Sequence, residues 1–212
     1  MVKAPRVILA DDHKLVAEAL RKLIAPQFDV VAIASDGHEL LGLAASLRPD
    51  LVVVDVAMPL LNGLEAVRQL KNKMPGIKVV FLTMNEDPDL AREAMDAGAS
   101  GYVLKKSAAS ELVDALSAAI RGKSYVTRQI AREMQESFTR DPNGSSRDRS
   151  ITPRQRQVVQ LLAEGKSMKE AADVLKVAPR TVAFHKYRLM QDLRLKTSAE
   201  VVQFAIKNRI VV

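Results

Sequence analysis

The sequence contains no cysteine and no tryptophan, and only 4% of its residues are aromatic. Without cysteine it can form neither a disulfide nor a thiolate metal site, and it offers no thiol nucleophile. No apolar run approaches the roughly 20 residues that a transmembrane helix needs. The start of the chain, Met1–Pro5, also lacks the apolar core of a signal peptide. We therefore expect a cytoplasmic protein in a reducing compartment, with no membrane partner.

Signatures of nucleotide-binding and hydrolytic enzymes are missing as well. Two Gly-Lys-Ser triplets end like a phosphate-binding loop, but Ser117 and Gln160 stand where that loop requires its first glycine. The sequence has no GxGxxG dinucleotide fingerprint and no GxSxG nucleophile elbow. These absences favour a protein that is not an enzyme.

Positive charge is concentrated in the second part of the chain. Residues 1–123 contain 15 Lys and Arg against 16 Asp and Glu, whereas residues 124–212 contain 17 against 9. This asymmetry predicts two domains, of which the second could meet a polyanion such as nucleic acid. Charge alone leaves a solvated basic surface as an equal alternative.

The first 121 residues alternate short β-branched runs with amphipathic helical patterns. The expected strands are Arg6–Ala10, Val30–Ala34, Leu51–Asp55, Val79–Thr83 and Gly101–Leu104. They are apolar without strict alternation, which is typical of parallel strands covered on both faces. We predict an α/β domain over residues 1–123, a (βα)5 doubly wound parallel sheet with right-handed crossovers.

Residues 124–150 form a connecting segment. Ile130, Met134 and Phe138 recur at helical spacing, so a connecting helix is plausible. The polar stretch Thr139–Ser150 contains a proline and a glycine without an apolar anchor, and it predicts a flexible linker.

Residues 151–212 show helical patterns only, and we predict an all-α domain of four short helices. Three helix starts carry capping boxes. In a capping box, two residues that are three positions apart each accept a hydrogen bond from the backbone N–H of the other. These boxes pair Thr152 with Gln155, Ser167 with Glu170, and Thr197 with Glu200. A fourth helix should begin near Pro179. The spacing of Lys169–Leu175, a turn at residues 176–178 and Arg180–Leu193 suits a helix-turn-helix, although any small helical bundle contains similar pairs.

Polar residues follow the expected strands of the first domain at the ends where ligands bind in parallel sheets. Asp11 and Asp12 follow the first strand, Asp55 ends the third, Thr83 ends the fourth and Lys105 follows the fifth. Clustered carboxylates need a cation, and an oxygen-only ligand set selects a hard metal, for which Mg²⁺ is the best candidate. A carboxylate can accept a phosphoryl group, and a hydroxyl and an ammonium can neutralise its oxygens. Each residue alone also fits an ordinary loop, cap or surface position.

Several segments in this order resemble the receiver domain of bacterial response regulators. They are Ile8–His13 (ILADDH), Val53–Pro59 (VVDVAMP), Leu61–Gly63 (LNG), Val80–Met84 (VFLTM) and Ala97–Lys106 (AGASGYVLKK). The resemblance covers residues 5–121. It implies that Asp55 accepts the phosphoryl group. It also implies that Asp12, Asp55 and the backbone carbonyl of Ala57 hold Mg²⁺, with Asp11 acting nearby or through water.

The same resemblance assigns roles around the phosphoryl group. Thr83 and Lys105 would contact the phosphoryl oxygens, and Tyr102 would be a switch aromatic that turns inward when Thr83 moves. The alternative for Tyr102 is a surface tyrosine on an edge strand. His13, His38 and His185 show no metal-ligand spacing, so we do not expect a histidine ligand. A phosphatase that uses Asp55 as nucleophile would need a second carboxylate two residues later, where Ala57 stands.

Residues 150–212 are similar to the LuxR-type helix-turn-helix, through the segments Ile151–Gln155, Leu161–Ser167, Lys169–Ala172 and Arg180–His185. The whole chain thus resembles the NarL/FixJ subfamily of response regulators. This implies a sensor histidine kinase and double-stranded DNA as partners, and a homodimer when the protein is phosphorylated or DNA-bound. The expected DNA contacts are Arg180, Thr181, Ala183, Phe184, Lys186, Tyr187 and Arg188.

Within these contacts, Thr181, Lys186 and Arg188 are expected mainly at phosphates, while Phe184 and Tyr187 can touch thymine methyl groups. The last helix, with Val201, Val202, Ala205 and Ile206 on one side, is a candidate dimer interface.

Two residues depart from the subfamily. Lys176 stands where glycine is common, so a left-handed conformation there would be strained. Ala178 replaces a capping serine, which weakens the recognition-helix cap by about 1 kcal/mol. The alternative function is a phosphorylation-independent module with the receiver fold that binds DNA or protein.

Overall fold

The computed structural model describes residues 4–84, 86, 88–140, 151–208, 210 and 211. The chain divides into two compact units, whose described residues run to Arg140 in the N-terminal unit and from Ile151 in the C-terminal unit. Of the predicted linker, only Thr139 and Arg140 are described, and they end a helix. Residues 141–150 lie outside the described part of the chain.

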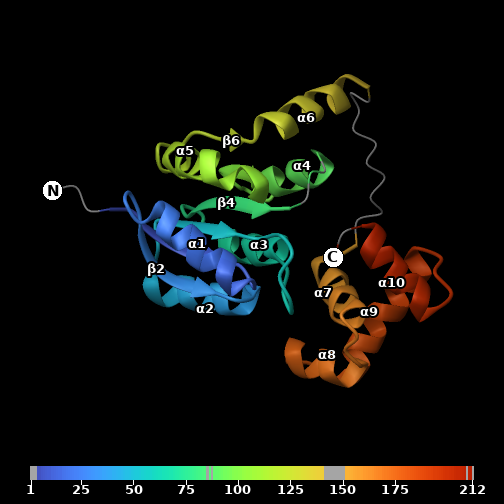
Figure 1. Cartoon of the computed structure of the whole chain (residues 1–212). Helices are drawn as coiled ribbons and strands as arrows, with labels where there is room; N and C mark the ends of the chain where they lie inside the picture. The colour runs from blue at the N-terminus through green and yellow to red at the C-terminus, as the bar shows by residue number, and fades with distance from the viewer. Residues whose placement is uncertain (1–3, 85, 87, 141–150, 209, 212) are drawn as a thin grey trace. The chain divides into compact units, whose positions relative to one another are not determined.

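The N-terminal unit contains a parallel sheet with strand order β2-β1-β3-β4-β5-β6 (Figure 1). The strands are β1 (Arg6–Ala10), β2 (Asp29–Ala34), β3 (Leu51–Val54), β4 (Lys78–Thr83), β5 (Gly101–Leu104) and β6 (Tyr125–Val126). All residues of β3 and β5 are buried, as expected of central strands covered on both faces. The order confirms a doubly wound parallel sheet.

Helices cover both faces of this sheet. They are α1 (Lys14–Ile24), α2 (Gly37–Leu47), α3 (Gly63–Lys73), α4 (Pro88–Asp96) and α5 (Ala108–Ile120), with a short 3₁₀ turn at Lys105–Ser107. α1 and α5 bury their apolar sides against alternate residues of four strands, among them Val7, Val53 and Leu82. Among the described residues, no helix has the length and apolar character that crossing a bilayer requires.

The sheet has a sixth strand that the sequence pattern did not predict. β6 pairs with β5 through Gly101 opposite Tyr125 and Tyr102 opposite Val126. It leads into α6 (Arg128–Arg140), the plausible connecting helix, which contacts α4 (Figure 1). A strand of two residues is too short to show a period of two, so only β5 had been identifiable at this end of the sheet.

The C-terminal unit consists of α7 (Pro153–Ala163), α8 (Met168–Leu175), α9 (Pro179–Asp192) and α10 (Ser198–Lys207). The capping boxes at Thr152 and Ser167 form as predicted. At Thr197 only half of the predicted box forms, because Thr197 accepts from the Glu200 N–H while the Glu200 carboxylate accepts from the N–H of Lys196. Val158, Leu161 and Val182 belong to one apolar cluster, and Val159 and Leu189 to another. This all-α unit confirms the second half of the fold prediction.

The predicted dimer face on α10 is wrong for two of its four residues. Val201 and Ala205 are buried in the core of their own unit, so they are not available to a second copy. Val202 is half-buried, and Ile206 is exposed. Sequence periodicity identified the apolar side of the helix correctly, but it cannot tell a side that faces the core from one that faces a partner.

Candidate functional site

An acidic pocket lies at the carboxyl ends of the strands in the N-terminal unit. Asp11 follows β1 and Asp55 follows β3, and both side chains are buried. Lys105, directly after β5, places its Nζ 2.7 Å from Oδ2 of Asp55 and 2.6 Å from Oδ2 of Asp11. Thr83 ends β4, is buried, and pairs in register with Leu104 beside Lys105. The structure therefore brings Asp11, Asp55 and Lys105 together, and it places Thr83 at the end of the strand next to β5.

Backbone hydrogen bonds fix the two buried carboxylates. The N–H of Asp55 donates to the carbonyl of Ala10, and the N–H of Asp11 donates to the carbonyl of Ala34. These bonds continue the parallel ladders just beyond the strands, where a side chain is free to point into the pocket. The N–H of Ala57 then donates to Oδ1 of Asp55 at 3.2 Å, which orients that carboxylate.

A glycine closes the loop that carries Asp55. The N–H of Gly63, the first residue of α3, donates to the carbonyl of Val56. A Cβ atom at this position would lie 2.0 Å from the carbonyl oxygen of Asp55 and 2.9 Å from Cγ1 of Val54. Neighbouring Asn62 caps α3 by accepting from the N–H of Glu65. The loop can adopt this path because residue 63 lacks a side chain.

The electrostatics of the pocket are unequal on its two sides. Burial raises the pKa of Asp55, and the hydrogen bond and charge of Lys105 offset that rise only in part. Burial would lower the pKa of Lys105, but its hydrogen bonds and ion pairs with Asp11 and Asp55 outweigh burial and raise it. One ammonium group thus serves two buried carboxylates. The electrostatics of the pocket therefore favour binding of a further cation.

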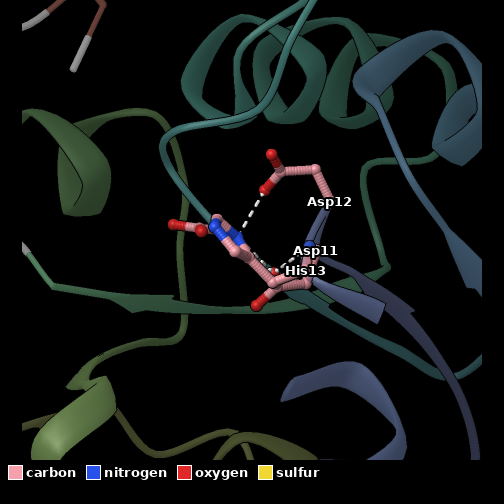
Figure 2. A group of neighbouring side chains, drawn as sticks. Asp11, Asp12 and His13 are labelled. Atoms are coloured by element: carbon pink, nitrogen blue, oxygen red, sulfur yellow. Dashed lines mark hydrogen bonds and ion pairs between the residues drawn. The ribbon is translucent and has the colours of Figure 1, made fainter. Parts of the chain in front are cut away.

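A candidate metal site adjoins this pair. The ligand atoms of Asp11, Asp12, His13 and Asp55 all lie within 4.8 Å of one another. Asp12 and His13 are exposed, and Nδ1 of His13 lies 2.8 Å from Oδ1 of Asp12 and 3.3 Å from Oδ1 of Asp11 (Figure 2). Three carboxylates fit Mg²⁺, which prefers oxygen ligands and keeps several waters.

His13 lies beside the acidic pocket, although its position in the sequence does not predict a metal ligand. It directly follows Asp12, and Nδ1 of its ring reaches both Asp11 and Asp12. The signal that could have found it is adjacency to the acidic pair. The His13 side chain is 65% exposed, so it is the least enclosed member of this group.

Tyr102 is fully buried in β5, and β6 lies alongside its strand. The alternative of a surface tyrosine on an edge strand is therefore wrong. The backbone carbonyl of Tyr102 accepts a hydrogen bond from the N–H of Thr127. Oγ1 of Thr127 accepts from the N–H of Leu104 at 3.2 Å and donates to Glu111 on α5 at 2.8 Å. These bonds join β5, the strand that precedes Lys105, to the start of α6.

A second, exposed cluster joins Lys106, the neighbour of Lys105 in the sequence, to α6. Nζ of Lys106 donates to Glu86 at 2.7 Å and to Gln129 at 3.0 Å, and Gln129 donates to Glu86 at 2.9 Å. The bonds from Lys106 and Gln129 lower the pKa of Glu86. Sequence reasoning missed Thr127, Glu86 and Gln129, because their partners lie 16 to 43 residues away along the chain.

The C-terminal unit presents one side of α9 to solvent. Five exposed residues recur on this side at helical spacing, namely Arg180, Phe184, Tyr187, Arg188 and Gln191, and Pro179 and Asp192 at the two ends of the helix are exposed as well. Thr181, Ala183 and Lys186 are half-buried on the flanks. Nζ of Lys186 donates to Ser198 at 2.8 Å. Every expected DNA contact thus lies on or beside this exposed side.

Lys176 and Ala178, the two residues that depart from the subfamily in the turn before α9, have the predicted geometry. Lys176 ends α8 in a left-handed conformation, with φ 52° and ψ 46°. Ala178 is the N-cap of α9 and supplies no side-chain cap bond. These two residues therefore carry strain and an unmade bond at the junction of the two helices.

Comparison with protein families gives two matches in this chain. The family described as "Response regulator receiver domain" matches residues 7–117. The family described as "Bacterial regulatory proteins, luxR family" matches residues 149–205. The first match contains the acidic pocket, and the second contains α8 and α9.

Relatives match along nearly the whole chain. The uncharacterized transcriptional regulatory protein YxjL of Bacillus subtilis is 35% identical over 211 residues, and response regulator GacA of Pseudomonas aeruginosa is 33% identical over 209 residues. Both alignments cover 97% of this chain and 97% of the relative. A solved structure of two RcsB dimers bound to two parallel DNAs is 25% identical, with a TM-score of 0.59, and covers 95% of this chain and 98% of that one.

Proposed function

The chain belongs to the two-component response regulators that join a receiver domain to a LuxR-type DNA-binding domain, and we propose that phosphoryl transfer to Asp55 controls its binding to promoter DNA. The observation that carries this proposal is the ion pair of Asp55 and Lys105, in which Oδ2 of Asp55 and Nζ of Lys105 lie 2.7 Å apart. Relatives of this chain are transcriptional regulators. The proposed domains are residues 1–123 for the receiver, 124–150 for the connection and 151–212 for DNA binding.

Asp55 is the proposed nucleophile. A carboxylate oxygen of Asp55 attacks the phosphorus of a phosphohistidine on a sensor histidine kinase; the new O–P bond forms as the N–P bond breaks, and the leaving imidazole takes a proton. Lys105 is close enough to neutralise a phosphoryl oxygen bound at Asp55, and Thr83 supplies a hydroxyl at the end of the neighbouring strand. Asp11, Asp12, Asp55 and the Ala57 carbonyl are the proposed Mg²⁺ ligands. When bound there, Mg²⁺ supplies neutralisation of the crowded oxygens.

The proposed switch is a shift between two receiver conformations. Thr83 moves toward the phosphoryl group and Tyr102 occupies its buried position. The bonds from Thr127 to Leu104 and Glu111 offer a route by which movement in β5 reaches α6. Since α6 leads toward the C-terminal unit along the chain, its position is the proposed output of the receiver.

The C-terminal unit supplies the proposed DNA-binding surface, with α9 in the major groove. A homodimer on DNA is proposed from the RcsB dimers on DNA, and not from α10, where Val201 and Ala205 are buried in the core of their own unit. A regulator with these partners acts in the cytoplasm and performs no catalysis apart from its own phosphorylation. The second candidate is a phosphorylation-independent module. It keeps the fold and the DNA surface, but it gives no function to the buried charged side chains of Asp11, Asp55 and Lys105.

The deciding experiment is intact-mass measurement after incubation with Mg²⁺ and acetyl phosphate. We expect the parent to gain the mass of one phosphoryl group and Asp55→Asn to gain none. Asp114→Asn, an exposed aspartate on α5, is the matched control and should behave like the parent. An unmodified parent, tested also with purified sensor kinases, would favour the phosphorylation-independent module. A modified Asp55→Asn would show that another residue is the acceptor.

A further inference from the structure

The exposed side of α9 carries two aromatic side chains where a DNA-reading helix usually carries hydrogen-bonding groups. Phe184 is 60% exposed and Tyr187 is 58% exposed. Exposed large apolar groups cost free energy in water, so a pair of them on one helix side indicates a surface that becomes buried against a partner. The partner must therefore offer apolar contact at two neighbouring points.

Neighbouring side chains hold both rings. The ring of Phe184 meets His185 edge-on, with centroids 5.4 Å apart and planes at 74°. Burial and the charge of Arg154 lower the pKa of His185, which favours its neutral form. Nζ of Lys186 lies 5.6 Å from the centre of the Tyr187 ring and is itself fixed by Ser198. Such contacts reduce the entropy that the rings lose on binding.

The charges around the pair identify a polyanion as the partner. Arg180 and Arg188 flank the rings on the exposed side, and Lys186 adjoins Tyr187. Asp192 lies 3.7 Å from Arg188 and is the one acidic residue of α9, so the cations of the helix stay in excess. Residues 151–212 contain 12 Lys and Arg against 5 Asp and Glu. An apolar pair surrounded by cations fits a groove whose walls are phosphates, whereas a protein partner of mixed charge would not require this surplus.

Within the DNA major groove, the apolar features of base edges are the C5-methyl groups of thymine. Residues 184 and 187 are about 4.5 Å apart along a helix, a spacing that reaches the same or adjacent base pairs. We propose that α9 recognises its operator through contacts of Phe184 and Tyr187 with thymine methyl groups, while Arg180, Lys186 and Arg188 contact phosphates. This inference rests on the proposed function, because it takes DNA as the ligand of α9.

The test removes the methyl groups without changing the base pairing. The full chain, with and without acetyl phosphate treatment, selects duplexes from a random-sequence pool. The enriched duplex is then synthesised with deoxyuridine in place of thymidine, one position at a time. At the positions that the rings contact, we expect the Kd to rise about fourfold for each methyl group lost. Phe184→Ala and Tyr187→Ala should each abolish the deoxyuridine effect at one of these positions. Leu15→Ala, an exposed apolar change in the N-terminal unit, should leave both effects intact.

Three outcomes overturn the proposal in distinguishable ways. Salt-dependent binding that is unchanged by deoxyuridine would show that the rings do not read methyl groups, while the DNA-binding function stands. A deoxyuridine effect that persists in the Phe184→Ala/Tyr187→Ala double variant, shown to be folded by its unfolding curve, would assign the effect to DNA stiffness. No salt-dependent binding to any duplex, treated or untreated, would remove the proposed DNA-binding function together with this inference.

Discussion

The acidic pocket of the N-terminal unit and the exposed side of α9 use their side chains in opposite ways. In the pocket, Asp11 and Asp55 are buried and Lys105 is nearly so, and each interacts with another charged group. On α9, Phe184 and Tyr187 are more than half exposed, and the residues that hold the helix in place, Val182 and Leu189, lie on the opposite side. The atoms of the pocket therefore serve folding and function together, whereas α9 separates the two tasks.

This difference determines what a substitution can do in each region. In the pocket, a change that alters chemistry must also alter stability, because the same buried groups are involved. On α9, the contact surface can change without a stability cost, and the stability of the helix can change without altering the contact surface. The predictions below test this contrast, beginning with the largest expected effect.

Gly63→Ala should damage stability and chemistry together. The added Cβ would lie 2.0 Å from the Asp55 carbonyl oxygen, so the loop that carries Asp55, the proposed acceptor, must move. We expect a loss of about 3 kcal/mol in the free energy of unfolding of the receiver, the upper part of the range for overpacked sites, measured by urea denaturation. Phosphorylation by acetyl phosphate should fall at least tenfold.

The matched control for this change is Gly42→Ala in α2, where a Cβ would meet nothing within 4 Å. Alanine favours the helix, so this variant should gain about 0.5–1 kcal/mol and keep its phosphorylation rate. If Gly63→Ala were as stable as the parent, the loop would be adaptable, and the link between packing and chemistry in the pocket would be broken.

Asp55→Asn should abolish phosphorylation and yet stabilise the fold at neutral pH. Burial raises the pKa of Asp55 above its ordinary value of 3.8, so the folded state binds this proton more tightly than the unfolded state. Stability from this group is complete below pH 3.8 and is lost as the pH rises through the raised value. We therefore expect Asp55→Asn to gain roughly 1–2 kcal/mol at pH 7 without Mg²⁺, and nothing at pH 3.5.

Thermal unfolding in a chelating buffer, at a series of pH values, measures this gain. Asp114→Asn, which removes an exposed carboxylate from α5, should change the melting temperature little at any pH. A less stable Asp55→Asn at pH 7 would mean that the ion pair with Lys105 outweighs the cost of burial. The pocket would then be optimised for stability as well as for chemistry.

Local signals in the sequence were sufficient for strands β1 to β5, the four C-terminal helices and the residues at the strand ends. Apolar runs placed β1 and β3, capping boxes placed α7 and α8, and strand ends brought Asp11, Asp55 and Lys105 into one pocket. These features depend on short-range periodicity and on the rule that parallel strands end at the same edge. Sequence reasoning could therefore predict them.

What could not be predicted depends on tertiary context. β6 has only two residues, and its pairing with β5 decides that Tyr102 is interior. Thr127 finds its partners in Leu104 and Glu111 only after folding. The apolar side of α10 had the pattern of an interface, but burial assigned Val201 and Ala205 to the core. Periodicity identifies an apolar side, and only the packed structure shows what covers it.

The smallest expected effect concerns the stability of α9 alone. Ala178 is the N-cap of α9 without a side-chain cap bond, so Ala178→Ser should add a hydroxyl that can accept from a backbone N–H of the first turn. We expect a gain of about 1 kcal/mol in the unfolding of the C-terminal unit, measured by urea denaturation of the full chain. Ala178→Val, which offers no acceptor, should gain nothing. Because Phe184 and Tyr187 lie beyond the first turn, the preference for thymidine over deoxyuridine should stay the same in Ala178→Ser. A changed preference would show that the cap also positions the contact surface, and α9 would then resemble the pocket in joining stability to function.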